Sequence, residues 1–159
     1  MTQILANKFF ELLNHHQVPF FIIGGHAVSF HGFIRTTEDI DIVWIRSPQA
    51  EQSLLEALQQ IHAQWISDEI DPATKLETLV PVSEAWLKST RLMVLITDYG
   101  FVDLFDYIPG CPDADVDQVF EQSENSNGTR YVSLPWLLQM KKAANRAQDQ
   151  RDLEFLGCV

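Results

Sequence analysis

Two aspartates, Asp39 and Asp41, stand two positions apart in an apolar run. Residues 39–44 are typical of a strand, and side chains on a strand alternate between its two faces. Both carboxylates therefore share one face, while Ile40 and Ile42 enter the core. Carboxylate oxygens are ligands that Mg²⁺ prefers. The pair indicates a magnesium site, and the alternative is a half-exposed strand that carries two acids without binding a metal.

A third acid, Asp103, interrupts the apolar strand expected over residues 101–105, which should lie beside the aspartate strand. Asp98 and Asp106 stand at strand ends, where contact with water explains them more simply. Three carboxylates without a cation would repel one another and raise one another's pKa. Mg²⁺ would relieve this repulsion and bridge phosphate oxygens, and a second ion would activate an acceptor hydroxyl. The three acids therefore favour phosphate chemistry.

A glycine pair, Gly24-Gly25, directly follows the apolar residues 18–23, which are typical of a buried strand. Glycine lets the backbone approach an anion closely, and a helix that begins here would point free N–H groups at that anion. The spacings of a P-loop and of a Rossmann dinucleotide site are both absent. A tight strand-to-helix turn without a ligand is the alternative.

Basic residues near the C-terminus offer the matching positive charge. Lys142 and Arg146 stand four apart on one helix face, and Lys141 borders the apolar stripe of the same helix. The alternative is a solvated basic face. Asp149 and Asp152 are expected to pair with the neighbouring arginines.

Hydrophobic periodicity and turn residues give the order of the other elements. Helices are expected over residues 4–15, 25–30, 48–61 and 133–156, and strands over residues 18–23, 39–44, 91–96 and 101–105. Much of the stretch 108–130 is expected to be mobile loop, with a short helix around residues 116–122 as an alternative. Between residues 63 and 89 the pattern favours only a short strand at Trp65-Ile66 and a brief helix or turn over residues 82–88. This order predicts an α/β (α+β) fold, with a mixed sheet of four or five strands flanked by helices and covered mainly on one side. One domain, 1–159, is expected, with its core over residues 4–106 and its C-terminal helices over residues 133–156.

Net charge, the length of the apolar runs and the cysteine content limit the classes of binding partner and the location expected for this protein. The net charge of −11 and the sequence pI near 4.7 disfavour broad wrapping of nucleic acid. The apolar runs are too short to cross a bilayer, so no membrane partner is expected, and no secretory signal is visible. A cytoplasmic location with Cys111 and Cys158 as free thiols is the expectation.

Taken together, these residues resemble the nucleotidyltransferase superfamily, whose fold is shared by polymerase-beta-like enzymes. The resemblance is closest to small bacterial members related to the AbiEii toxins of abortive-infection and toxin–antitoxin systems. The residues and runs that carry it are Gly24-Gly25, the run from Arg35 to Asp41, Val102-Asp103-Leu104, and the late run from Met140 to Leu153.

The resemblance implies a nucleotidyltransferase fold and assigns roles to eight residues. By this likeness Gly24 and Gly25 would hold the triphosphate of an NTP, Arg35 and Thr37 would steady phosphates near the entrance, and Lys141 would help neutralise the triphosphate. Asp39 and Asp41 would coordinate Mg²⁺, and Asp103 would complete the site as a metal ligand or as the base toward the acceptor. Many members carry serine where this chain has Gly25, so phosphate binding here would rest on backbone amides.

The function expected from this likeness is Mg²⁺-dependent transfer of a nucleoside monophosphate from an NTP to an acceptor hydroxyl, with release of pyrophosphate. The acceptor is left open between RNA, protein and a small molecule. A non-catalytic binding or regulatory module with a protein partner, such as a toxin–antitoxin component, is the first alternative. A metal- or nucleotide-binding domain with hydrolytic activity is the second.

Overall fold

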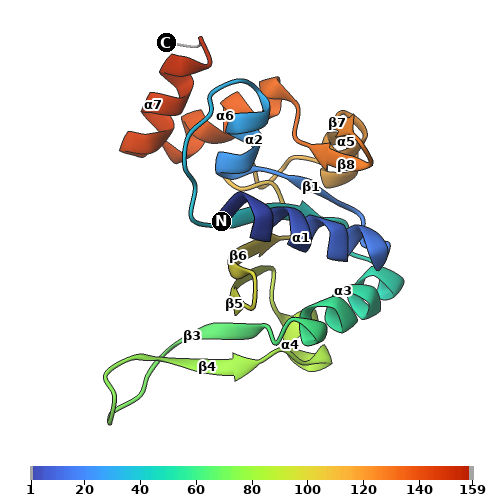
Figure 1. Ribbon diagram of the computed structural model, residues 1–159, viewed down its shortest axis with the longest axis vertical. Coiled ribbons are helices and arrows are strands. Elements are labelled where there is room, and N and C mark those ends of the chain that lie inside the picture. The colour runs from blue at the N-terminus through green and yellow to red at the C-terminus, as the bar shows by residue number, and fades with distance from the viewer. Residues whose placement is uncertain (1, 158–159) are drawn as a thin grey trace.

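The computed structural model describes residues 2–157, which form one mixed sheet with helices packed around it (Figure 1). The strands are β1 (Phe20–Ile22), β2 (Ile40–Trp44), β3 (Gln64–Ile70), β4 (Glu77–Pro81), β5 (Leu92–Thr97), β6 (Gly100–Phe105), β7 (Glu124–Ser126) and β8 (Thr129–Tyr131). The helices are α1 (Thr2–His15), α2 (Gly24–Phe30), α3 (Pro48–Gln60), α4 (Glu84–Ser89), α5 (Val116–Glu121), α6 (Leu134–Ala144) and α7 (Ala147–Phe155).

The strand order in the sheet is β4-β3-β5-β6-β2-β1-β8-β7. The pairs β2–β6 and β1–β8 are parallel, and every other neighbouring pair is antiparallel. The parallel pairing of β2 with β6 brings together the two strands that carry the predicted acids. The α/β architecture therefore agrees with the sequence analysis.

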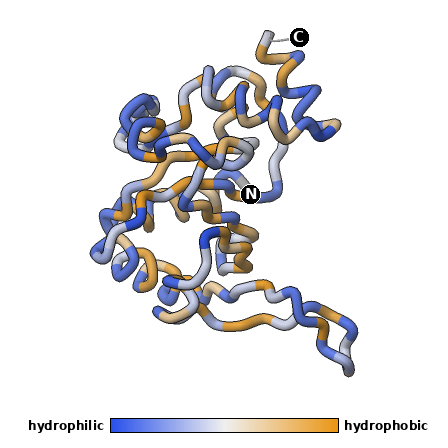
Figure 2. The backbone as a smooth tube through the Cα atoms, turned by 180° about the vertical axis from the view of Figure 1, so that it is seen from behind, coloured by the Kyte–Doolittle hydropathy of each residue, from blue (hydrophilic) through white to orange (hydrophobic). Residues whose placement is uncertain are grey.

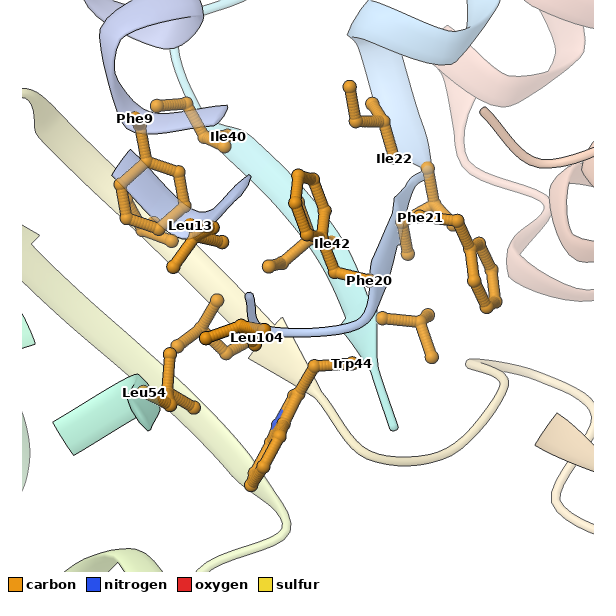
Figure 3. Packing of buried hydrophobic residues seen from close by; sticks show 14 of the residues in the cluster. Phe9, Leu13, Phe20, Phe21, Ile22, Ile40, Ile42, Trp44, Leu54 and Leu104 are labelled. Atoms are coloured by element: carbon orange, nitrogen blue, oxygen red, sulfur yellow. The ribbon is translucent and has the colours of Figure 1, made fainter. Parts of the chain in front are cut away.

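A large part of the core lies on the face of the sheet that α1 and α3 cover (Figure 3). Phe9 and Leu13 of α1 and Leu54 of α3 pack there against Ile42 of β2 and Leu104 of β6, and all five side chains are fully buried. Burying a large apolar side chain contributes roughly 1.5–3 kcal/mol, so this face fixes the orientation of both strands. The alternate residues of β2 and β6 must then point away from α1 and α3.

The runs Ser47-Pro48 and Ser133-Leu134-Pro135 each predict a helix start with serine as the N-cap and proline in the first turn. Ser47 accepts a hydrogen bond from the backbone N–H of Ala50 at 3.0 Å, and Pro48 occupies the first turn of α3, as the sequence predicts. Ser133 stands at the same place before α6, but its side chain makes no capping hydrogen bond. The prediction of a serine cap is therefore wrong for α6.

The sheet has eight strands, so the prediction of four or five is wrong. One reason is the stretch 108–130, which contains α5 and the β7–β8 hairpin instead of being mostly loop. Asn127 and Gly128 form the hairpin turn with φ of 52° and 86°. Asn-Gly with positive φ at both positions is a strong hairpin signal, and it was present in the sequence.

Two more strands, β3 and β4, form an antiparallel hairpin that projects away from the rest of the molecule (Figures 1 and 2). Of this hairpin the sequence indicates only the short strand at Trp65-Ile66. We call residues 64–81 the arm. At its base the ring of Trp65 lies 5.6 Å from that of Trp86 in α4. The alternation of apolar and acidic residues along the arm is too irregular to read as a strand pattern from sequence.

Two expectations concern single features. No helix within residues 2–157 combines the length and the apolar character needed to cross a membrane. Cys111 forms no disulfide within the described residues, and Cys158 lies outside them.

Candidate functional site

Asp41 of β2 and Asp103 of β6 are direct partners in the parallel register of the two strands. Each alternates with buried residues, Ile40 and Ile42 around the first and Val102 and Leu104 around the second. Both carboxylates therefore leave the sheet on the face opposite α1 and α3. The prediction that the strand of Asp103 lies beside the aspartate strand is confirmed.

The two carboxylates perturb each other. Burial, followed by the charges of Asp103 and Asp39, raises the pKa of Asp41 from 3.8 to about 7, against an opposing effect of Lys141. Burial and the charge of Asp39 also raise the pKa of Asp103, while a hydrogen bond with Asp41 lowers it. The contact between the two side chains thus raises the pKa of Asp41 and lowers that of Asp103, so it favours the proton on Asp41. Such a pair without a cation stores electrostatic repulsion.

Asp39 lies just before β2 and is exposed, so it acts on the pair through its charge. Across residues 2–157, no group of three or more His, Cys, Asp or Glu side chains is arranged to hold a metal ion. The structure therefore brings Asp41 and Asp103 together but does not preform a three-carboxylate site with Asp39.

The glycine turn lies directly over the carboxylate pair. Gly24 has φ +65°, and a Cβ at this position would collide with Oδ2 of Asp41. A Cβ at Gly25 would lie 2.5 Å from Oγ1 of Thr37. Both positions require glycine because the backbone passes so close to functional side chains.

Gly24→Ala is expected to destabilise the fold more than Gly128→Ala, its matched control. Both glycines have positive φ, which costs a side chain roughly 1–2 kcal/mol. A Cβ at Gly128 meets nothing within 4 Å, so only Gly24→Ala adds the collision with Asp41. Urea unfolding of the two variants measures the difference, and equal losses of unfolding free energy would show that the turn does not press on the carboxylate.

Behind the turn, a buried network of ion pairs joins three parts of the chain. Lys141 of α6 lies between Asp149 and Asp152 of α7, with Nζ to oxygen distances of 3.1 and 2.9 Å. Arg35, in the loop before β2, donates two hydrogen bonds to Asp152 at 2.8 and 2.9 Å. Arg146 donates to Asp149 at 2.7 Å. The network fixes α7 against α6 and against the loop that leads to Asp39.

The pKa values of the two network aspartates show how strongly they are held. Burial works to raise the pKa of Asp149 and of Asp152, but hydrogen bonds from the network cations lower both below the usual value. Asp149 therefore pairs with Arg146 as expected, whereas Asp152 pairs with Arg35 and Lys141. The pairing of Asp152 with Arg35, 117 positions away along the chain, has no local pattern that would predict it.

This network changes the roles open to the predicted phosphate ligands. Lys141 is only 6 % exposed, and its ammonium group already has two carboxylate partners. Arg35 is likewise committed to Asp152. Arg146 keeps 75 % of its side chain exposed and carries a charge that interacts with Asp41. Arg146 is thus the network cation best placed to meet a ligand.

Two cavities meet at this point. The first cavity has a volume of about 250 Å³. Part of its wall is apolar and includes Phe105, Leu137 and Met140, so we call it the apolar cavity. The second, of about 310 Å³, runs under the glycine turn past Arg35 and Thr37, and we call it the polar cavity. Both are lined by the same six residues, namely Gly24, Asp39, Asp41, Lys141, Arg146 and Asp149.

The eight residues chosen from sequence all line one or both cavities. Their placement in one cleft is what the fold adds to the sequence reading, and their individual roles stay predictions. The cleft also contains Arg146 and Asp149, which the sequence analysis did not count among the site residues.

The donor atoms of the cleft fit a magnesium ion. Mg²⁺ is usually held by one or two carboxylates, with water and substrate phosphates as the remaining ligands. Asp41 and Asp103 supply two facing carboxylates whose pKa values are raised by burial and by the charges of neighbouring aspartates, and a cation would offset both effects. The Gly24 turn leaves the space beside Asp41 free of side-chain atoms of its own.

Comparison with known proteins supports the fold. No protein-family model matches the chain, and no curated protein matches it. Two solved structures from Helicobacter pylori do. JHP933 is 17 % identical with a TM-score of 0.51, over 97 % of this chain and 63 % of its own. A protein named as a candidate nucleotidyltransferase is 15 % identical with a TM-score of 0.51, over 98 % of this chain and 66 % of its own.

This chain therefore spans less than two thirds of the length of each of these two structures. At such low identity the likeness concerns the fold alone. The chain has a nucleotidyltransferase-like fold, with a larger sheet than its sequence suggested.

Proposed function

We propose that this protein is a Mg²⁺-dependent nucleotidyltransferase that moves a nucleoside monophosphate from an NTP to an acceptor hydroxyl. The observation that carries the proposal is the pair Asp41 and Asp103, in register on adjacent strands where the two cavities meet. The likeness in fold to a candidate nucleotidyltransferase supports it. A cytoplasmic setting, a single domain and kinship with the AbiEii toxins are part of the same proposal and rest on the sequence.

In this proposal Asp41 and Asp103 would hold Mg²⁺, with Asp39 joining from the edge of the cleft. The ion would neutralise phosphate charge and polarise the bond that breaks. Gly24 and Gly25 would let the triphosphate lie against the backbone, and Arg146 would approach it from the cleft mouth. Lys141 and Arg35 would contribute positive charge without contacting the triphosphate, because their carboxylate partners hold them in place.

The reaction balances as a single displacement. The acceptor oxygen forms a bond to the α-phosphorus, the bond from that phosphorus to the bridging oxygen breaks, and pyrophosphate leaves with the electron pair. The proton of the acceptor hydroxyl passes to Asp103. The side chains supply positioning and charge, which carry most of the catalysis in phosphoryl transfer.

Calorimetry with a non-hydrolysable NTP analogue, with and without MgCl₂, tests the proposal. We expect binding that requires magnesium and that weakens at least about tenfold in Asp103→Asn. The control is Asp113→Asn, which removes an equal charge from an exposed loop outside both cavities. With α-labelled NTP and pools of RNA or protein as acceptors, Asp103→Asn should lower the rate of transfer at least about 100-fold.

The contrary results separate the candidates. Magnesium-independent binding, or none, would overturn the catalytic proposal. It would favour a nucleotidyltransferase-fold regulatory module, for example a toxin–antitoxin component with a protein partner. The commitment of Arg35 and Lys141 to internal ion pairs is the observation that favours this second candidate. Release of free phosphate or NMP without a labelled acceptor would indicate hydrolysis.

A further inference from the structure

The arm presents a strand edge that lies open. β4 is the terminal strand of the sheet and pairs only with β3. Within residues 2–157, no backbone hydrogen bond outside the sheet ladders and helices reaches residues 77–81. Such an edge exposes N–H and C=O groups that can accept a further strand.

The same arm exposes apolar side chains well away from the core. Ile70, Leu76, Leu79 and Val80 are 54 %, 67 %, 44 % and 36 % exposed. Figure 2 shows orange, hydrophobic segments along the arm at a distance from the body. Large exposed apolar groups gathered on one projecting element are typical of an interaction surface.

The arm is built as an ordered element. At its tip Oδ1 of Asp71 accepts a hydrogen bond from the N–H of Ala73 at 2.7 Å, and the N–H of Lys75 donates to the carbonyl of Asp71 at 2.8 Å. An isolated two-stranded hairpin is marginally stable in water, so an added strand would stabilise it.

Both faces of the edge offer an apolar contact. Leu79 lies across from Ile66, and Val80 lies across from Trp65 on the opposite face. An added strand with apolar side chains on alternate positions would meet one of these two pairs whichever face it chose. The remaining positions of that strand would be free to carry charge.

The charge of the arm indicates which kind of partner the β4 edge would bind. Residues 64–81 contain four carboxylates and one lysine, a net charge of −3, in a chain of net charge −11. A second copy pairing through the same edge would bring two acidic arms together, and a nucleic acid would be repelled. A basic polypeptide would be attracted.

We propose that the β4 edge binds an extended, basic segment of another protein, which adds to the sheet as a further strand with apolar and basic side chains in alternation. The proposal concerns a surface outside the cleft and does not depend on the proposed catalytic activity.

The test uses three synthetic peptides of about ten residues, a length typical of long strands. The first alternates valine with lysine, the second alternates valine with glutamate, and the third repeats the first with alternate backbone nitrogens methylated. Fluorescence anisotropy should show binding of the first and at least about tenfold weaker binding of the other two. Equal binding of the methylated peptide would overturn strand addition, because that peptide keeps the charge but loses backbone donors.

Two protein variants locate the site. Leu79→Arg changes the arm edge, and Ile4→Arg makes the same replacement of an exposed apolar side chain on α1. We expect Leu79→Arg to weaken binding of the valine–lysine peptide at least about tenfold and Ile4→Arg to change it less than about twofold. Equal effects would place the peptide elsewhere and overturn the proposal.

Two further outcomes would also overturn it. Sedimentation that shows a dimer dissociated by Leu79→Arg would make a second copy the occupant. Binding of a labelled single-stranded oligonucleotide to the protein in the absence of peptide, altered by Leu79→Arg and not by Ile4→Arg, would make the surface a nucleic-acid site.

Discussion

Asp41→Asn is expected to raise the stability of the metal-free protein at pH 8 while abolishing the proposed transfer. Burial, then the charges of Asp103 and Asp39, raises the pKa of Asp41 to about 7, so folding at pH 8 must bury an unfavourable charge. One pKa unit corresponds to about 1.4 kcal/mol. An asparagine of the same shape should therefore gain roughly 2–4 kcal/mol, or on the order of 5–10 °C in melting temperature.

The pH dependence has a definite sign. Between the unfolded value of 3.8 and the folded value of about 7, the folded protein binds more protons at Asp41 than the unfolded chain does. The stability of the unmodified protein should therefore fall as pH rises through this window. Asp41→Asn should flatten that part of the curve, and it should differ little from the unmodified protein at pH 4.

Thermal melts in EDTA across pH 4–8 make the measurement, with Asp113→Asn as the control for the loss of one negative charge. A melting temperature at pH 8 that is unchanged or lower in Asp41→Asn would contradict the repulsion between the paired carboxylates. A gain in stability together with a loss of activity is the pattern expected when a site keeps unfavourable charges for function.

Lys141→Met is expected to be the most destabilising single change in the cleft. The ammonium group lies between Asp149 and Asp152, whose side chains are at most 1 % exposed. Removing one partner from a buried ion pair costs about 3–5 kcal/mol, because the remaining charge stays buried without compensation. Methionine keeps the length and apolar stem of lysine, so lost packing contributes little.

Lys142→Met is the matched control, since the neighbouring lysine is exposed and the same charge is removed. Urea unfolding should show a loss of less than about 0.5 kcal/mol there. Equal effects of the two substitutions would show that the network does not hold α7 in place.

The face and the neighbourhood of the acids could be predicted from the sequence because strand alternation is a local property. Asp41 and Asp103 alternate with apolar residues that must be buried, and this fixed their direction before any tertiary contact was known. The structure adds the register that makes them direct partners. Asp39 was expected on the same strand face as Asp41, but it lies just before β2 and is exposed, so strand alternation does not fix its direction.

The ion-pair network could not be predicted, since it depends on contacts between distant residues. The distance of Arg35 from Asp152 along the chain, and the turn at Asn145 with φ 50° that folds α7 back onto α6, are not readable from periodicity. Of the arm, only the short strand at Trp65-Ile66 was predicted, because half-exposed strands lack a clear alternation of apolar and polar residues. The β7–β8 hairpin, by contrast, carried a legible Asn-Gly signal.

The long excursion between β2 and β6 has a consequence for how this architecture can vary. Residues 45–99, including the arm, connect two strands that lie side by side, and the entropy of closing such a loop rises only slowly with its length. Segments could thus be lengthened, shortened or exchanged at the tip near residue 73 while the geometry of the acids is preserved. The arm could therefore change its binding partner while the acids of β2 and β6 keep their positions.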